Sequence, residues 1–175
     1  MELLVKLFCQ AVKEVISRQA LQDVGDEELT EVQVACLRFI YLHNRASVGE
    51  IATGLGISNA AATKLIDRLA RKGLVGRGAD PKDRRVLRLE LTETGEMLVK
   101  AFQSGESRRL NELLAQMDEM QWQALRQGLT GFLTTALTKP EDVERICLKC
   151  GRSHRESCPG NQIYRGLTGK EKENV

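Results

Sequence analysis

The hydrophobic pattern changes period in the middle of the chain, and this change restricts the possible folds more than any other feature of the sequence. Ser47-x-x-Glu50 is a capping box that predicts the start of a short helix ending at Gly56. Ser58, two residues after Gly56, predicts the start of a second helix. From Leu74 the pattern alternates between apolar and polar residues around a charged tip, which predicts a two-stranded hairpin.

Helical periods flank this region on both sides. Apolar residues recur every three or four positions over residues 3–22, 30–43, 92–114 and 118–137. An apolar fraction of 42% in 175 residues is enough for one packed domain with an appendage. The expected fold class is therefore mainly α with a small β hairpin (α+β). Two short helices followed directly by a hairpin predict a winged helix-turn-helix.

Basic residues are concentrated in the second short helix and the hairpin. From Lys64 to Arg88 there are nine bases and three acids, a net charge of +6, whereas the whole chain carries +2 and the remainder therefore −4. A confined basic surface on a mildly acidic protein suits phosphate binding, although a solvated face has the same composition. No apolar run approaches the roughly 18 residues of a membrane span, and the N-terminus has no leader pattern, so a cytoplasmic protein is expected.

The second helix of a winged helix-turn-helix fits the major groove of DNA, and a basic wing reaches the minor groove or the phosphates. Asn59 and Lys64 have the chemistry for base edges, and Arg68 is suited to phosphates. The residues predicted to contact DNA are Ser47, Ser58, Asn59, Ala60, Thr63, Lys64, Arg68, Arg77, Lys82, Arg84 and Arg85.

A set of short motifs carries a specific family resemblance. They are the Leu29-Thr30 helix start, Glu50-Ile51-Ala52, Leu55-Gly56, Ser58, Asp67-Arg68-Leu69, Lys72-Gly73-Leu74-Val75, the wing Asp80-Pro81-x-Asp83-Arg84-Arg85 and the exit Leu91-Thr92-x-x-Gly95. With these motifs the sequence resembles the MarR family of bacterial transcriptional regulators over nearly all of the chain to residue 138.

The resemblance implies a homodimer that binds a palindromic operator, as a repressor released by a ligand, a metal or a redox signal. It also implies a possible small-molecule effector and a wing arginine in the minor groove. That role falls to Arg84 or Arg85, with Asp83 orienting it. Residues 60–62 are all alanine where relatives often have Ser or Thr, so methyl contacts replace hydroxyl donors there.

The resemblance, together with the residues beyond it, predicts five parts of the chain. A dimerisation helix (1–28) precedes the winged helix-turn-helix domain (29–92), and two further dimerisation helices (93–139) follow it. A Cys/His segment (140–165) and a disordered tail (166–175) complete the chain.

The Cys/His segment has the spacing Cys147-x-x-Cys150-x-x-x-His154-x-x-x-Cys158. Three thiolates and one imidazole are a common ligand set for tetrahedral structural zinc. The segment contains few apolar residues, so zinc is expected to order it. An iron–sulfur or sensory metal, a redox switch of the Cys147–Cys150 pair and an unliganded tail remain alternatives. A buried, inert thiol is expected for Cys9, which follows two large apolar residues.

The sequence argues against two other functional classes. A metal-dependent enzyme is not expected, because four protein ligands would leave zinc no open coordination position for water. A thiol-dependent enzyme is not expected either, because Cys147 and Cys150 lack the strand–helix context of a thiol oxidoreductase. A winged-helix module that binds proteins is the remaining alternative to a DNA-binding regulator, and the +6 segment argues against it.

Overall fold

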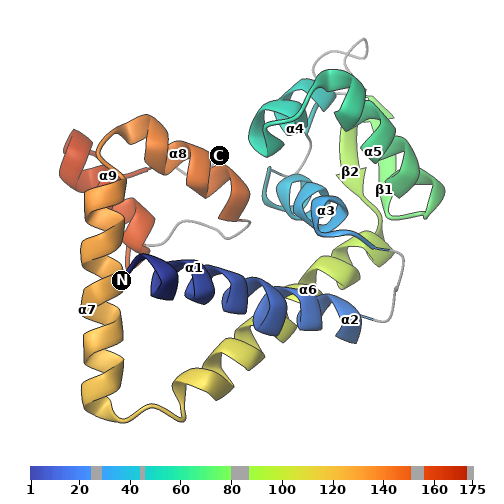
Figure 1. The fold of residues 1–175 in the computed structure, drawn as a ribbon. Coiled ribbons are helices and arrows are strands. Elements are labelled where there is room, and N and C mark those ends of the chain that lie inside the picture. The colour runs from blue at the N-terminus through green and yellow to red at the C-terminus, as the bar shows by residue number, and fades with distance from the viewer. Residues whose placement is uncertain (25–28, 44–45, 80–86, 151–155, 173–175) are drawn as a thin grey trace.

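The computed structural model describes residues 1–24, 29–43, 46–79, 87–150 and 156–172. Over these ranges the chain is helical except for one two-stranded antiparallel sheet, which confirms the expected fold class (Figure 1). None of the helices in these ranges is long and apolar enough to cross a membrane. The elements in chain order are α1 (Glu2–Ala11), the π-helical segment η1 (Val12–Arg18), α2 (Gln19–Asp23), α3 (Glu31–His43), α4 (Val48–Leu55), α5 (Asn59–Arg71), β1 (Val75–Ala79), β2 (Leu87–Leu91), α6 (Glu93–Leu114), α7 (Glu119–Ala136), α8 (Pro140–Cys150) and α9 (Pro159–Thr168).

The helix-turn-helix begins and turns where the sequence predicts. Ser47 Oγ accepts a hydrogen bond from Glu50 N at 3.2 Å, and Ser47 N donates to Glu50 Oε2 at 2.6 Å, so the capping box of α4 is complete. Gly56 ends α4 with a φ of 69°, a left-handed conformation that glycine adopts without steric cost. Ser58 Oγ then accepts from Ala61 N at 3.2 Å and caps α5. Local sequence therefore determines this turn.

The hairpin is attached to the segment that precedes α4. β1 and β2 pair in an antiparallel register that runs from Val75 opposite Leu91 to Ala79 opposite Leu87. Leu89 also exchanges two backbone hydrogen bonds with Ala46, at 2.9 and 3.1 Å. The hairpin and the helix-turn-helix are therefore one structural unit, which we call the winged-helix lobe (α3 to β2). The wing tip, residues 80–86, lies outside the described residues.

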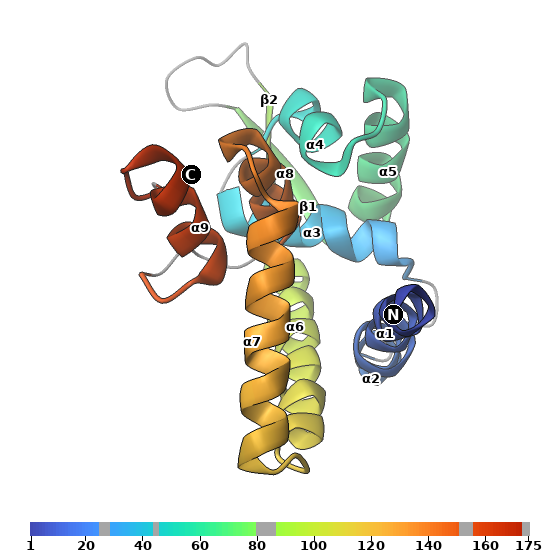
Figure 2. The ribbon, with the colours of Figure 1, turned by 60° about the vertical axis from the view of Figure 1, so that its left-hand side comes forward.

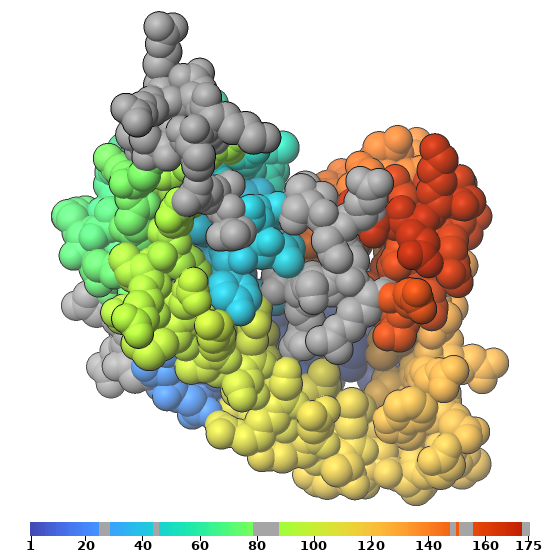
Figure 3. Space-filling view, turned by 180° about the vertical axis from the view of Figure 1, so that it is seen from behind, coloured from blue at the N-terminus to red at the C-terminus, as the bar shows by residue number. Residues whose placement is uncertain are grey.

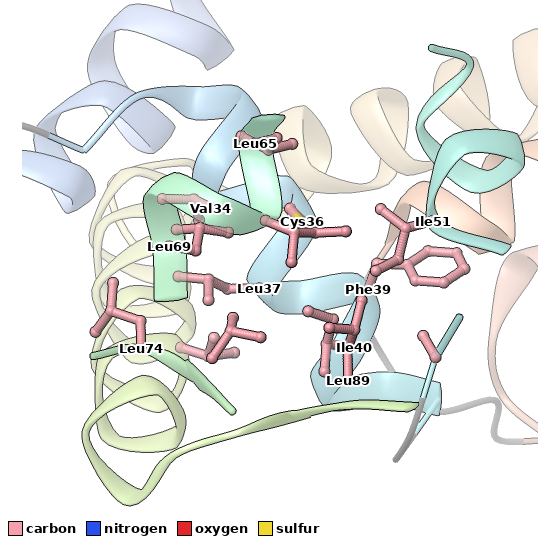
Figure 4. Packing of buried hydrophobic residues seen from close by; sticks show 14 of the residues in the cluster. Val34, Cys36, Leu37, Phe39, Ile40, Ile51, Leu65, Leu69, Leu74 and Leu89 are labelled. Atoms are coloured by element: carbon pink, nitrogen blue, oxygen red, sulfur yellow. The ribbon is translucent and has the colours of Figure 1, made fainter. Parts of the chain in front are cut away.

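The main core lies inside the lobe, between α3, α4, α5 and the hairpin (Figure 4). Six of its large side chains are 1% exposed or less: Leu37, Ile40, Ile51, Ile66, Leu69 and Leu89. The exit motif joins α6 to this core through a glycine. A Cβ on Gly95 would lie 2.1 Å from the carbonyl oxygen of Leu74, so only glycine permits this close approach.

Helices outside the lobe leave large apolar faces uncovered. The segments η1 and α2 pack against α6, whereas α1 and α7 contain no buried residue (Figure 2). Cys9 of α1 is exposed in the single chain, contrary to the burial expected from its neighbours. The exposed large apolar side chains of these helices include Leu3, Leu4, Leu7, Phe8, Leu110, Leu113, Met120, Trp122, Leu129 and Phe132.

The last two helices, α8 and α9, form a C-terminal unit with a small core of its own. Leu137, Val143 and Cys147 are buried there, with Leu133, Ile163 and Tyr164 packed against them. This corrects the expectation that the segment has too few apolar residues to order itself. Two of these side chains, Leu133 and Leu137, come from α7 and its C-cap, which the sequence assigned to the dimerisation helix.

The boundary predicted between the Cys/His segment and the tail falls inside a helix. Helix α9 continues to Thr168, past the predicted boundary at residue 165, and Lys172 N donates to Asn161 Oδ1 at 2.9 Å. In the space-filling view, the C-terminal unit and the lobe lie on opposite sides above the α6–α7 pair (Figure 3).

Candidate nucleic-acid interface

Helix α5 divides into a buried side and an exposed side. Ala62, Leu65, Ile66 and Leu69 pack into the lobe. Because the helix repeats every 3.6 residues, four of the predicted contact residues lie away from this side, and Asn59 is exposed in the first turn, so all five are exposed. They are Asn59, Ala60, Thr63, Lys64 and Arg68. The helix therefore presents an amide, an ammonium, a guanidinium and methyl groups toward solvent, held by a packed inner side.

Three hydroxyl groups are oriented by hydrogen bonds to the helix backbone. Ser47 Oγ and Ser58 Oγ each accept a backbone N–H. The hydroxyl hydrogen of Ser58 is thereby left able to donate to an acceptor such as a phosphate oxygen, whereas the Ser47 side chain also hydrogen-bonds to the Glu50 carboxylate. Ser58 is exposed, whereas Ser47 is half-buried. Thr63 Oγ1 donates its hydrogen to the carbonyl of Asn59 at 2.9 Å. Toward a ligand, the Thr63 side chain can therefore accept a hydrogen bond or make a methyl contact.

The first strand of the wing is connected to α5 by an ion pair. Arg77 Nη2 of β1 donates to Asp67 Oδ1 of α5, and both side chains are 48% exposed. Arg77 was predicted as a DNA contact, and in the structure it also braces the hairpin against the helix. The other predicted wing contacts, Lys82, Arg84 and Arg85, lie outside the described residues.

A second ion pair connects the other strand to α4. Arg88 Nη1 of β2 lies 2.7 Å from Glu50 Oε2. Hydrogen bonds from the Ser47 backbone and side chain hold the pKa of the Glu50 carboxyl below its ordinary value of 4.5, and Arg88 lowers this pKa further, while burial opposes the shift. The sequence predicted the capping role of Glu50 but not this partner, because Arg88 is 38 residues away and no local pattern connects the two.

The C-terminal thiols are only partly brought together. A Cβ on Gly160 would lie 3.4 Å from Cys147 Sγ and 3.7 Å from Cys158 Sγ, so these two sulfur atoms are at most 7.1 Å apart, the sum of the two distances. Cys147 is buried, Cys158 is half-buried at the N-cap of α9, and Cys150 is exposed. Burial raises the pKa of the Cys147 thiol, Lys172 lowers it, and Cys158 and Cys150 raise it further.

The predicted four-ligand set is not assembled in the described part of the chain. His154 lies outside the described residues. Among those that are described, no three His, Cys, Asp or Glu side chains form a group that could hold a metal ion, so the three thiols do not form one in this conformation.

Comparisons with known proteins agree with this lobe. Residues 29–87 match the model of the MarR family. The HTH-type transcriptional repressor MdtR of Bacillus subtilis (strain 168) is 31% identical over 101 residues, which are 58% of this chain and 65% of MdtR. The HTH-type transcriptional regulator YsmB of the same organism matches over 59% of its length. The chain thus spans less than two thirds of these two curated relatives.

Solved structures show the same architecture over more of the chain. MepR, a transcription regulator of the Staphylococcus aureus multidrug efflux pump MepA, has a TM-score of 0.65 at 25% identity and covers 76% of this chain and 96% of its own. A mutant of S. aureus MepR bound to an oligodeoxyribonucleotide has a TM-score of 0.59 at 26% identity, over 77% of this chain and 96% of its own. The sequence match, the capped helix-turn-helix and the paired wing strands show that residues 29–87 are similar to the winged-helix domain of the MarR family.

Proposed function

We propose that this protein is a DNA-binding transcriptional regulator of the MarR type that acts as a homodimer. One observation carries the proposal: α5 presents Asn59, Thr63, Lys64 and Arg68 on an exposed face. An ion pair connects β1 to this helix, and another connects β2 to α4. A rigid helix with donors and cations at its N-terminal end is suited to the major groove.

The electrostatics support DNA in preference to a protein partner. The segment from Lys64 to Arg88 carries a net charge of +6 in a chain of net charge +2. Cations that neutralise phosphates release counterions, so binding must weaken steeply with salt. Repression is the direction of regulation that we favour, because MdtR, which is 31% identical, is described as a transcriptional repressor.

A second copy of the chain is the partner proposed for the uncovered apolar faces. Helices α1 and α7 bury none of their own side chains in the single chain. Trp122, Leu129 and Phe132 of α7 remain 38–57% exposed. A two-fold dimer would bury these faces and place two α5 helices on two equivalent half-sites, which accounts for a palindromic operator.

The function is tested by DNA binding of the full chain over a salt series. A palindromic operator selected in vitro from random duplex DNA is expected to bind a dimer, with an affinity that falls linearly on a logarithmic plot against salt. The double variant Asn59→Ala with Lys64→Ala is expected to lose at least about tenfold in affinity, since each good base contact contributes about 1–3 kcal/mol. No enrichment of any operator, or binding by the double variant equal to wild type, would refute the proposal.

Zinc at the C-terminal segment is part of the same proposal. Its support is the spacing of Cys147, Cys150, His154 and Cys158 and the proximity of the Cys147 and Cys158 sulfurs across Gly160. Elemental analysis of untagged protein should find one zinc per chain. Protein that contains no zinc and does not take it up, with all three thiols of this segment reactive, would exclude the metal.

A further inference from the structure

The C-terminal unit is built directly onto the end of α7. Only residues 137–139 separate α7 from α8, and Asp142 N donates to the carbonyl oxygen of Lys139 at 3.0 Å in the first turn of α8. Leu133 and Leu137, from α7 and its C-cap, pack with the buried Val143 of α8 in one small core. Because the connection is short and the core is shared, the direction of α8 is set by α7.

Helix α8 is also docked on the winged-helix lobe. It packs against both α3 and α4, and Figures 1 and 2 show it between the end of α7 and these two helices. The same two helices support α5, which packs on α3, α4 and β1. The C-terminal unit therefore bridges α7 and the helices that carry the recognition helix.

Arg38 of α3 fastens this bridge. Its Nη1 lies 3.3 Å from Glu106 Oε2 of α6, and both side chains are less than one-fifth exposed. Its Nη2 donates to the carbonyl oxygen of Cys150, the last residue of α8. The guanidinium also lies 5.7 Å from the centroid of the Phe102 ring of α6. One side chain therefore joins α3, α6 and the end of α8.

The anchoring of Arg38 on α6 involves a further element. Ser17 Oγ of η1 donates to Glu106 Oε1 at 2.9 Å, so both carboxylate oxygens of Glu106 are engaged. An arginine fork can serve two acceptors at once from different nitrogens, whereas lysine is a single point charge. Arg38 thus holds the lobe to α6 with one nitrogen and to α8 with another.

This attachment is additional to the chain connections of the lobe. The backbone enters the lobe before α3 and leaves it after β2 toward α6. The sequence resemblance to the MarR family ends at residue 138, before α8 begins at Pro140. The contact between α8 and the lobe is therefore a feature of this chain beyond the part that resembles the family.

We propose that the C-terminal unit is a brace, with Arg38 as its positioning residue, that fixes the lobe relative to α7 and so restricts the half-site spacing that the dimer accepts. The inference rests on the DNA-binding homodimer proposed above. The two recognition helices of such a dimer must reach half-sites about one DNA turn apart. One inserted base pair moves a half-site by about 3.4 Å and about a tenth of a turn, and a braced lobe does not follow this change.

The test uses the full-length protein and loosens the brace at two places. Arg38→Lys keeps a cation beside Glu106 and removes the second donor of the fork. Val143→Ala leaves the lobe unaltered and opens a cavity in the core of the C-terminal unit, where Val143 is 1% exposed. Two exposed positions supply matched controls: Arg145→Lys on α8 and Val32→Ala on α3.

Two readouts separate the brace from its effect on DNA. Hydrogen exchange without DNA is compared between α4, which contacts α8, and α5, which packs on α3, α4 and β1. Affinity is then measured for the selected operator and for versions with one base pair inserted or removed at its centre. The ratio of these affinities reports spacing tolerance, because it cancels any uniform loss of binding.

The brace predicts a distinct pattern among these proteins. Arg38→Lys and Val143→Ala are expected to exchange faster than wild type in α4 and α8 but not in α5. Wild type and both controls should lose at least about tenfold in affinity when the spacing changes by one base pair. The two loosened variants should lose no more than about threefold, because their lobes can follow the displaced half-site.

Different failures have different meanings. Exchange in α4 that stays at the wild-type rate in either loosened variant, or that rises equally in α5, would overturn the brace. A spacing ratio equal to that of wild type in either variant would overturn the control of half-site spacing. If no operator binds, the DNA-binding function fails, and exchange in α4 still decides whether the C-terminal unit holds the lobe.

Discussion

Glu50 is a single residue that serves two elements. It completes the capping box of α4 with Ser47 and pairs with Arg88 of β2. Its pKa is lowered in the folded protein from an ordinary value of 4.5, so the unfolded chain binds its proton first as the pH falls. The stability that this carboxylate contributes is therefore complete above about pH 4.5 and is lost as the pH falls through the folded pKa.

Replacement of Glu50 by glutamine should expose this dependence. The variant is expected to be less stable at pH 7 by no more than about 1 kcal/mol, because the side chain is 55% exposed. The difference should shrink toward zero as the pH is lowered below the folded pKa. Urea unfolding at several pH values measures this difference in the free energy of unfolding. Glu93→Gln, at the first position of α6, is the control. A difference of equal size at low pH would mean that the charge of Glu50 is not its cause.

Arg85 is the wing residue on which the operator affinity should depend. Arg85→Ala is expected to weaken operator binding by roughly 1–3 kcal/mol and to lower the slope of affinity against salt by about one charge. Arg145→Ala, which removes an exposed arginine from α8, serves as the matched control and should leave both unchanged. Equal affinity of Arg85→Ala and wild type across the salt series would show that this arginine does not contact DNA.

Helix α4 offers a matched pair of glycines that tests its packing. A Cβ on Gly54 would lie 2.1 Å from Cε2 of the buried Phe39 ring, whereas nothing lies within 4 Å of a Cβ on Gly49. Gly54→Ala should therefore destabilise the protein by about 1–3 kcal/mol through overpacking. Gly49→Ala should stabilise it by up to about 1 kcal/mol, because alanine favours the helix.

Thermal unfolding of the two variants decides this prediction. Opposite shifts of Tm are expected, downward for Gly54→Ala and upward or unchanged for Gly49→Ala. A Gly54→Ala variant as stable as wild type would mean that Phe39 can move aside, and that α4 is less tightly fixed on α3 than its contacts indicate.

The assembly of two chains depends on the apolar face of α7. Phe132 is 57% exposed in the single chain, and a glutamate there would bury an unpaired charge in the proposed interface. Phe132→Glu is expected to raise the dimer dissociation constant roughly 100-fold or more. Sedimentation equilibrium measures this change. Val32→Glu, 51% exposed on α3, is the control, and a Phe132→Glu protein that remains as dimeric as the control would place the interface elsewhere.

The recognition helix and its turn could be predicted from sequence because their signals are local. Ser47, Gly56 and Ser58 act on groups within three or four residues of themselves, and the buried positions of α5 follow from its period. The same rules missed helices α8 and α9. Their core is completed by Leu133 and Leu137, which belong to the preceding helix and its C-cap. The apolar residues within the segment are therefore only part of those that form its core.

The sequence by itself determined the order of elements, the caps, the wing and the basic face of the winged-helix domain. Only the tertiary structure decided which distant side chains hold these parts together: Asp67 with Arg77, Glu50 with Arg88, and Arg38 with Glu106 and the Cys150 carbonyl. The physical reason is the range of each interaction. Helix caps and hydrophobic periods act between neighbours along the chain. The partners in the Glu50–Arg88 ion pair are 38 residues apart, and those in the Arg38–Cys150 hydrogen bond are 112 residues apart. Such contacts form only after the core has brought their partners together.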